Sequence, residues 1–68
     1  MAVLKVIEVL AESNESWEGA AQEALKEASK TVKNVKSIYI KEMQAVVADE
    51  EIVSYRVNAK ISFLVVDE

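Results

Sequence analysis

The sequence contains no cysteine and no histidine, and these two absences exclude many of the sites at which small proteins hold metals or catalyse reactions. Without cysteine the chain forms no disulfide, offers no thiolate to zinc and has no cysteine nucleophile. Without histidine it lacks the most frequent general base at neutral pH. The remaining residues show no nucleophile paired with a base. We therefore expect that the protein is not an enzyme.

Positive charge and long apolar runs are also scarce. The chain carries 8 Lys and Arg against 12 Asp and Glu, a formal net charge of −4. Proteins that bind nucleic acid neutralise phosphates with clustered cations, so we expect no nucleic-acid partner. No apolar run approaches the roughly 18 residues of a membrane span, and Lys5 and Glu8 interrupt the first ten residues. We expect no membrane contact, no signal peptide and a cytoplasmic location.

Residues that break regular structure are few. Proline is absent, and glycine occurs once, at Gly19. The sequence therefore predicts long helices or strands with short connections, which form a single domain over residues 1–68. A chain of 68 residues buries only about 60% of the surface that its unfolded form exposes. We expect such a small domain to depend on partners for stability.

The first half predicts a strand followed by a helix. Residues 2–10 are rich in Val, Ile and Leu, which favour a strand, and the polar residues 12–16 end it. Ser13 is the preferred helix cap, although Asn14 and Ser16 also have suitable side chains. Gly19 lies inside the helix and indicates a close contact there. The helix shows an apolar stripe of period 3.6, formed by Ala20, Ala21, Ala24, Leu25, Ala28 and Val32.

The second half predicts a hairpin of two long strands. Asn34 suits the left-handed conformation at which a helix stops. Strands are expected over residues 36–47 and 52–66, joined by a four-residue polar loop. Antiparallel neighbours dominate in sheets, so the last strand is expected between the other two. The predicted fold is α+β, a β-α-β-β chain with a three-stranded antiparallel sheet and one helix on one of its faces.

Pairing Val47 with Ile52 across the loop fixes which residues share a face. The helix side then receives Ile38, Ile40 and Val46 together with Ile61, Ala59 and Val53. The other side receives Ser37, Tyr39, Lys41, Met43, Ala45 and Val47 together with Ile52, Ser54, Arg56, Asn58, Lys60 and Ser62. One helix covers only part of strands about 40 Å long. Because apolar surface and strand edges stay open, we expect a closed homo-oligomer.

Three stretches of the chain, VLKVIEVLAES, SWEGAAQEAL and SYRVNAKISF, resemble the dodecins in order and spacing. The resemblance covers nearly the whole chain. It implies a β-α-β-β protomer that assembles into a hollow homo-dodecamer of tetrahedral 23 symmetry. It also implies storage of a small ligand, since the best-known members stack flavins such as riboflavin, FMN or FAD between tryptophans of subunits related by a two-fold axis.

The family's flavin-stacking residues are replaced in this chain. The resemblance places the stacking tryptophan at Ser37 and the ring-binding glutamine at Arg56. Losing an indole removes about 1–3 kcal/mol of stacking, by analogy with nucleobases. Arg56 donates hydrogen bonds and accepts none, so it suits a carboxylate, phosphate or carbonyl. The candidate ligand-binding residues are Ser37, Tyr39 and Arg56, and weakened flavin binding is expected.

A second group of dodecins, associated with calcium, lacks the stacking tryptophan. This chain is similar to that group in Trp17 at the helix start and in Arg56 after Tyr55. Calcium prefers six to eight oxygen ligands, and no EF-hand spacing is present. The sequence assigns no metal ligands. It supplies these carboxylates: Glu8, Glu42, Asp49, Glu50, Glu51, Asp67 and Glu68.

Several of these residues also have structural interpretations. Trp17 opens the apolar stripe of the helix and is expected to pack in the core or between subunits. Arg56 suits a salt bridge with Glu42 or Glu51, and residues 49–51 suit a solvated turn. Met43 and Tyr39 suit subunit packing. The predicted function is a non-enzymatic shell that stores a small ligand, and the alternative is a calcium-binding or purely structural assembly.

Overall fold

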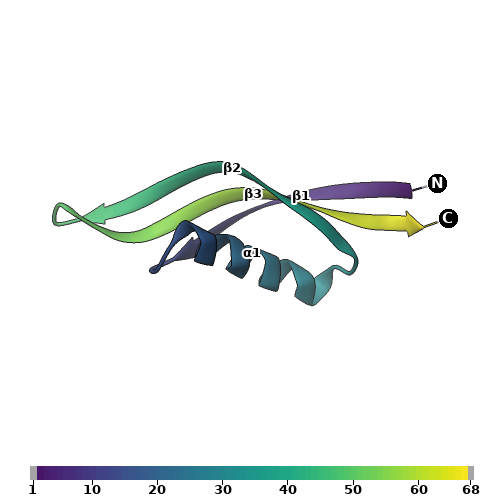
Figure 1. Ribbon diagram of the computed structural model, residues 1–68, viewed down its shortest axis with the longest axis horizontal. Coiled ribbons are helices and arrows are strands. Elements are labelled where there is room, and N and C mark those ends of the chain that lie inside the picture. The colour runs from purple at the N-terminus through teal and green to yellow at the C-terminus, as the bar shows by residue number, and fades with distance from the viewer. Residues whose placement is uncertain (1, 68) are drawn as a thin grey trace.

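The computed structural model describes residues 2–67, with the backbone only for Val66 and Asp67. Four elements follow one another: β1 (Ala2–Ser13), α1 (Trp17–Thr31), β2 (Val35–Ala48) and β3 (Glu51–Asp67) (Figure 1). The three strands form one antiparallel sheet in the order β1-β3-β2. The predicted β-α-β-β fold and the central position of the last strand are therefore confirmed. No helix among the described residues has the length and apolar character needed to cross a membrane.

The helix begins one residue after Ser16, and the prediction of Ser13 as its cap is wrong. The Ser16 backbone is extended, and its Oγ accepts a hydrogen bond of 2.8 Å from the Gly19 amide. Ser13 still belongs to β1, where it pairs with Tyr55. Its Oγ accepts from the Glu15 amide at 3.0 Å, inside the connecting turn. Pairing with β3 thus extends the strand to Ser13 and delays the helix by one turn.

Gly19 marks a close approach, as the sequence indicates. A Cβ at this position would lie 2.9 Å from Ser13 Oγ and 3.1 Å from Ser16 Oγ. Both hydroxyls are occupied in the turn and the cap. A side chain at Gly19 would push against the two groups that hold the start of α1, which accounts for a glycine in the first turn of a helix.

The helix ends at Thr31, and Val32 closes it by donating from its backbone N–H to the Ala28 carbonyl. Asn34 has a φ of 63°, the left-handed conformation predicted for it. Its carbonyl accepts a hydrogen bond of 3.0 Å from the Leu64 amide of β3. The connection between α1 and β2 is therefore fixed to the central strand.

The core lies between α1 and one face of the sheet. Ala24, Ala28 and Ile61 form its buried cluster, and Ile61 is fully buried. The small alanine side chains let the helix approach the middle strand closely. Partly buried side chains of the two outer strands, β1 and β2, pack around this cluster, namely Ile7, Val9, Ala11, Val35 and Ile38.

Two β-bulges change the predicted facing of the hairpin strands. The expected register holds for Ile38 with Ile61, for Ile40 with Ala59 and for Val47 with Ile52. Between these pairs the register is shifted by one residue, because Lys41 in β2 and Val53 in β3 have no partner. The shift pairs Met43 with Val57, Ala45 with Tyr55 and Val46 with Ser54. The predicted positions of Met43, Ala45 and Val46 are therefore wrong, because an unpaired residue reverses the alternation of a strand.

The hairpin loop contains two residues instead of the predicted four. Asp49 has a φ of 53° and Glu50 a φ of 65°, so both lie in the left-handed region. This is the backbone of a type I′ turn, which matches the twist of the flanking strands. Neither residue is a glycine, which would adopt a positive φ without steric cost. The turn therefore holds two side chains in a conformation that L-residues disfavour.

We expect Glu50→Gly to stabilise the protein by about 1 kcal/mol, because glycine adopts a positive φ without steric cost. The measurement is the urea midpoint at a fixed protein concentration. Glu51→Gly is the matched control, since it removes the same charge but lies in strand β3. The control should destabilise the strand. Equal shifts for the two variants would contradict this explanation.

Candidate functional site

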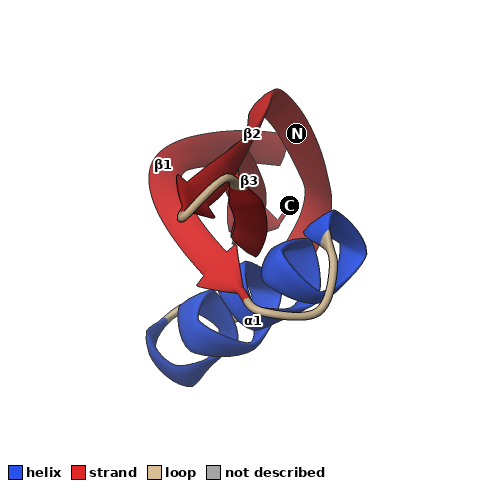
Figure 2. Ribbon diagram, turned by 90° about the vertical axis from the view of Figure 1, so that its left-hand side faces the viewer, coloured by secondary structure: helices blue, strands red, loops and turns tan. Residues whose placement is uncertain are grey.

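None of the described residues covers the face of the sheet opposite to α1, which is called the open face (Figure 2). Cross-strand pairing defines it, since partners share a face: Leu4 with Leu64, Val6 with Ser62, Glu8 with Lys60, Leu10 with Asn58 and Glu12 with Arg56. Its apolar side chains are far from buried, with Leu10 63% and Tyr39 64% exposed. The open face thus combines exposed apolar groups with a band of charged and amide side chains.

The three candidate ligand residues all lie on the open face. Ser37 pairs with Ser62, and their hydroxyl oxygens are 2.5 Å apart. Tyr39 pairs with Lys60. Arg56 lies six residues before Ser62 on β3, a separation of about 20 Å at about 3.3 Å per residue. Within one chain, Arg56 therefore does not reach a group bound at Ser37.

Arg56 forms a salt bridge, as predicted, but its partner is Glu12. Arg56 Nε donates to Glu12 Oε1 at 2.7 Å, and Ser54 Oγ donates to Glu12 Oε2 at 3.1 Å. Glu42 and Glu51 were the expected partners. Because β3 is the central strand, β1 lies on its other side and places Glu12 directly opposite Arg56. The hydrogen bonds from Arg56 and Ser54 lower the pKa of Glu12 below its ordinary value.

This lowered pKa makes the stability depend on pH. The folded chain favours ionised Glu12, so the stabilisation is complete above the ordinary value of 4.5 and is lost as the pH falls through the lowered pKa. We expect Glu12→Gln to flatten the loss of stability on acidification, measured as the urea midpoint between about pH 6 and about pH 3. The control is Glu23→Gln on the exposed side of α1. A profile for Glu12→Gln as steep as that of the control would contradict the assignment.

A second charged cluster lies further along the open face. Lys41 Nζ donates to Glu8 Oε2 at 3.4 Å, and this contact lowers the pKa of Glu8, with a further contribution from the Asn58 side chain. The bulge at Lys41 lets its side chain reach across β3 to β1. Asn58 Oδ1 is buried and accepts no hydrogen bond from the described residues. Sequence patterns identify neither cluster, since each joins strands that are distant in the chain.

Trp17 packs within the chain, in agreement with its structural interpretation. Its ring meets Tyr55 edge-on, with centroids 4.8 Å apart and an interplanar angle of 70°. Its Nε1 donates to the Gln44 carbonyl at 2.9 Å. Both polar and apolar parts of the indole are thus engaged, which ties the start of α1 to β2 and β3.

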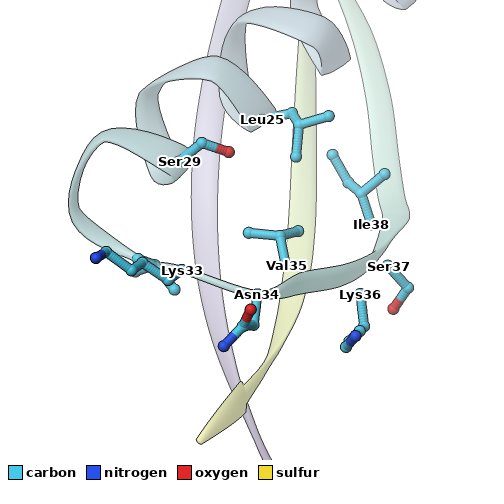
Figure 3. Close-up of a pocket in the computed structure, with 9 residues that line it drawn as sticks. Leu25, Ser29, Lys33, Asn34, Val35, Lys36, Ser37 and Ile38 are labelled. Carbon is cyan, nitrogen blue, oxygen red and sulfur yellow. The ribbon is translucent and has the colours of Figure 1, made fainter.

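A groove opens between the end of α1 and the start of β2, and we call it the α1–β2 groove (Figure 3). Its volume is about 670 Å³. It forms because the helix packs mainly over β1 and β3 and leaves β2 partly uncovered. The sequence does not predict this groove, since the tilt of a helix on a sheet leaves no pattern in the chain. Its lining residues are Leu25, Ser29, Val32, Lys33, Asn34, Val35, Lys36, Ser37 and Ile38.

Within one chain, the acidic side chains that the structure describes do not converge on a metal site. Among the described residues, no three Asp or Glu side chains lie close enough to hold a metal ion together. Glu8 and Glu12 are engaged by cations. Asp49 and Glu50 form the exposed hairpin turn, which agrees with a solvated turn. The side chain of Asp67 and all of Glu68 lie outside the described residues.

Comparison of the sequence with known proteins identifies one family. The family model for dodecin matches residues 3–66. A calcium dodecin from Mycobacterium tuberculosis is 33% identical over 63 residues, covering 93% of this chain and 89% of that protein.

Solved structures share the fold over most of the chain. A Thermus thermophilus protein superposes with a TM-score of 0.92 at 26% identity, covering all of both chains. A crystal structure of the calcium-chelating calcium dodecin from Mycobacterium tuberculosis, described with a novel calcium-binding site, gives a TM-score of 0.81 at 33% identity. It covers 90% of this chain and 87% of that one. From its sequence and its fold, the chain belongs to the dodecin family.

Proposed function

We propose that the protein is a non-enzymatic binding protein that works as a hollow homo-dodecamer, with its ligand sites at the contacts between subunits. One observation carries this proposal: the open face exposes Leu4, Val6, Leu10 and Tyr39 along strands that no other described segment covers. A lone subunit would keep this apolar surface in water. It would also keep the outer edges of β1 and β2 unpaired, a state that folded proteins rarely leave unprotected.

The positions of the candidate ligand residues support sites shared between subunits. Ser37 and Arg56 lie on one face but far apart along the strands. A second copy would have to bring its own residues next to Ser37 for a small planar ligand to be enclosed. We propose Ser37, Tyr39 and Arg56 as residues of such a shared site. A cytoplasmic location remains a prediction from the sequence.

Flavin fits the side chains of this chain poorly. A flavin ring bound at Ser37 would contact the hydroxyl groups of Ser37 and Ser62, whereas stacking requires an aromatic ring at this place. Arg56 is held by Glu12, and releasing it for a ligand would leave Glu12 without its strongest partner. Tyr39 is the exposed aromatic side chain nearest to Ser37 along β2. We therefore expect this chain to bind flavin weakly.

Calcium is the second candidate, and the similarity to the calcium dodecin favours it. Calcium requires several oxygen ligands, and the described residues of one chain do not gather three carboxylates. A calcium site would therefore need carboxylates from more than one subunit. We therefore propose that calcium, like flavin, would bind at the contacts between subunits.

The assembly and its ligand are tested by separate measurements. Light scattering at micromolar concentration should give a mass near twelve times the 7.5 kDa of one chain. A stable monomer would overturn the proposal. Quenching of riboflavin fluorescence by the purified protein at micromolar concentration would favour flavin storage. A melting temperature that rises with added calcium and falls with a chelator, without quenching, would favour calcium.

A further inference from the structure

The end of the β2–β3 hairpin at the turn and the end near α1 differ in the charge of their side chains. The end that carries the β2–β3 turn, which we call the hairpin tip, consists of the turn residues Asp49 and Glu50, the first residue of β3, Glu51, and the flanking Val47 and Ile52. Val47 is 62% and Ile52 is 56% exposed, although both are large apolar residues. The three acidic residues of the tip take part in none of the ion pairs found among the described residues. The tip is thus an exposed apolar arm that carries negative charge.

The α1–β2 groove has the opposite charge and an apolar floor. Leu25, Val35 and Ile38 point toward its interior from the helix and from β2 (Figure 3). Lys33 and Lys36 lie on its rim. Neither lysine takes part in an ion pair of the described residues, whereas the nearby Lys30 is bound to Glu27 at 2.6 Å. The groove therefore suits an apolar segment with acidic ends.

The tip cannot enter the groove of its own chain. From Lys36 in β2 to Asp49 in the turn the chain advances 13 residue steps, which is about 43 Å at about 3.3 Å per residue. The molecule as a whole is 53 Å long, and the tip lies at one end with the α1–β2 connection toward the other (Figure 1). Each of the two complementary surfaces therefore requires another copy of the chain.

We propose that the hairpin tip of one copy docks in the α1–β2 groove of the next. Val47 and Ile52 then cover the apolar floor, while Asp49 and Glu50 meet Lys33 and Lys36 at the rim. Because the two surfaces differ, the contact is head-to-tail, and it gives a closed assembly when successive copies return to the first. This inference rests on the proposed self-assembly and names one of its contacts.

The test is a charge exchange between the two surfaces. Lys33→Glu with Lys36→Glu makes the groove rim acidic, and Asp49→Lys with Glu50→Lys makes the tip basic. Each pair alone juxtaposes like charges, and the concentration at which the assembly dissociates should rise about 100-fold or more. All four substitutions in one chain restore opposite charges, and the mass of the assembly should return. Lys5→Glu with Lys26→Glu is the control, with the same change in net charge away from the groove.

Carbodiimide cross-linking of the unmodified assembly gives an independent measurement, because it joins a carboxylate to a lysine amine in direct contact. Mass spectrometry should find residues 49–51 joined to Lys33 or Lys36. An assembly without these cross-links, or a fourfold variant that stays dissociated, would overturn the docking contact alone. A groove variant that dissociates no more than the control pair would do the same. An unmodified protein that stays monomeric would overturn both this contact and the proposed function.

Discussion

Ile61→Ala is expected to cost about 2–5 kcal/mol of stability, the usual range for removing a large buried aliphatic side chain. Ile61 is fully buried under α1 and contacts Ala24 and Ala28. The methyl side chains of these alanines are too short to fill the cavity that the substitution leaves. A domain of this size has few other buried large side chains, since Val57 is the only comparable one among the described residues. We therefore expect the variant to be largely unfolded or strongly destabilised.

The control is Val65→Ala in the same strand. Val65 is 48% exposed, so its truncation should shift the urea midpoint only slightly. Both variants are compared at one protein concentration, because association stabilises the folded state by mass action. Similar midpoints for the two variants would show that the core under the helix does not hold the fold together.

Ser37→Trp is expected to tighten riboflavin binding about 5- to 150-fold, the equivalent of about 1–3 kcal/mol of stacking for one added ring. Ser37 is exposed on the open face, so an indole fits there without disturbing the buried core. The substitution breaks one hydrogen bond to the Ser62 hydroxyl, which is exposed to water and has a low cost. Fluorescence quenching of riboflavin gives the dissociation constant.

The control for the stacking ring is Ser37→Leu, which removes the same hydroxyl and adds apolar surface without an aromatic ring. It should leave the riboflavin affinity near that of the unmodified chain. Adding Arg56→Gln to Ser37→Trp tests the second replaced position, and it should tighten binding further only where a neighbouring subunit brings residue 56 to the ligand. Unchanged affinity in both tryptophan variants would refute the shared site.

Much of the backbone could be predicted from local patterns. The alanine stripe of α1 recurs every three or four residues, and the last strand alternates apolar and polar residues, so each element identifies its own buried side. Asn34 was predicted in the left-handed conformation because few other residues adopt it readily. These features depend on residues close together in the chain, which is why the sequence reveals them.

The errors arose where distant segments compete for the same residues. Ser13 has the side chain of a helix cap, but its pairing with Tyr55 keeps it in β1 and leaves the cap to Ser16. The bulges at Lys41 and Val53 compensate each other, so the register is as expected from Ser37 to Ile40 and again at Val47 and Ala48, and it is shifted between them. Nothing in the residues around Lys41 distinguishes a bulge from a regular strand.

The sequence by itself determined the order of the elements, the central position of the last strand and the family, because periodicity and motif order are properties of neighbouring residues. Tertiary structure alone decided that Arg56 binds Glu12, that Met43 and Ala45 change sides and that a groove opens beside Lys33 and Lys36. Each of these features depends on how the strands and the helix pack against one another. Such contacts join residues far apart in the chain. They form only when the chain is folded, and so no local pattern in the sequence reveals them.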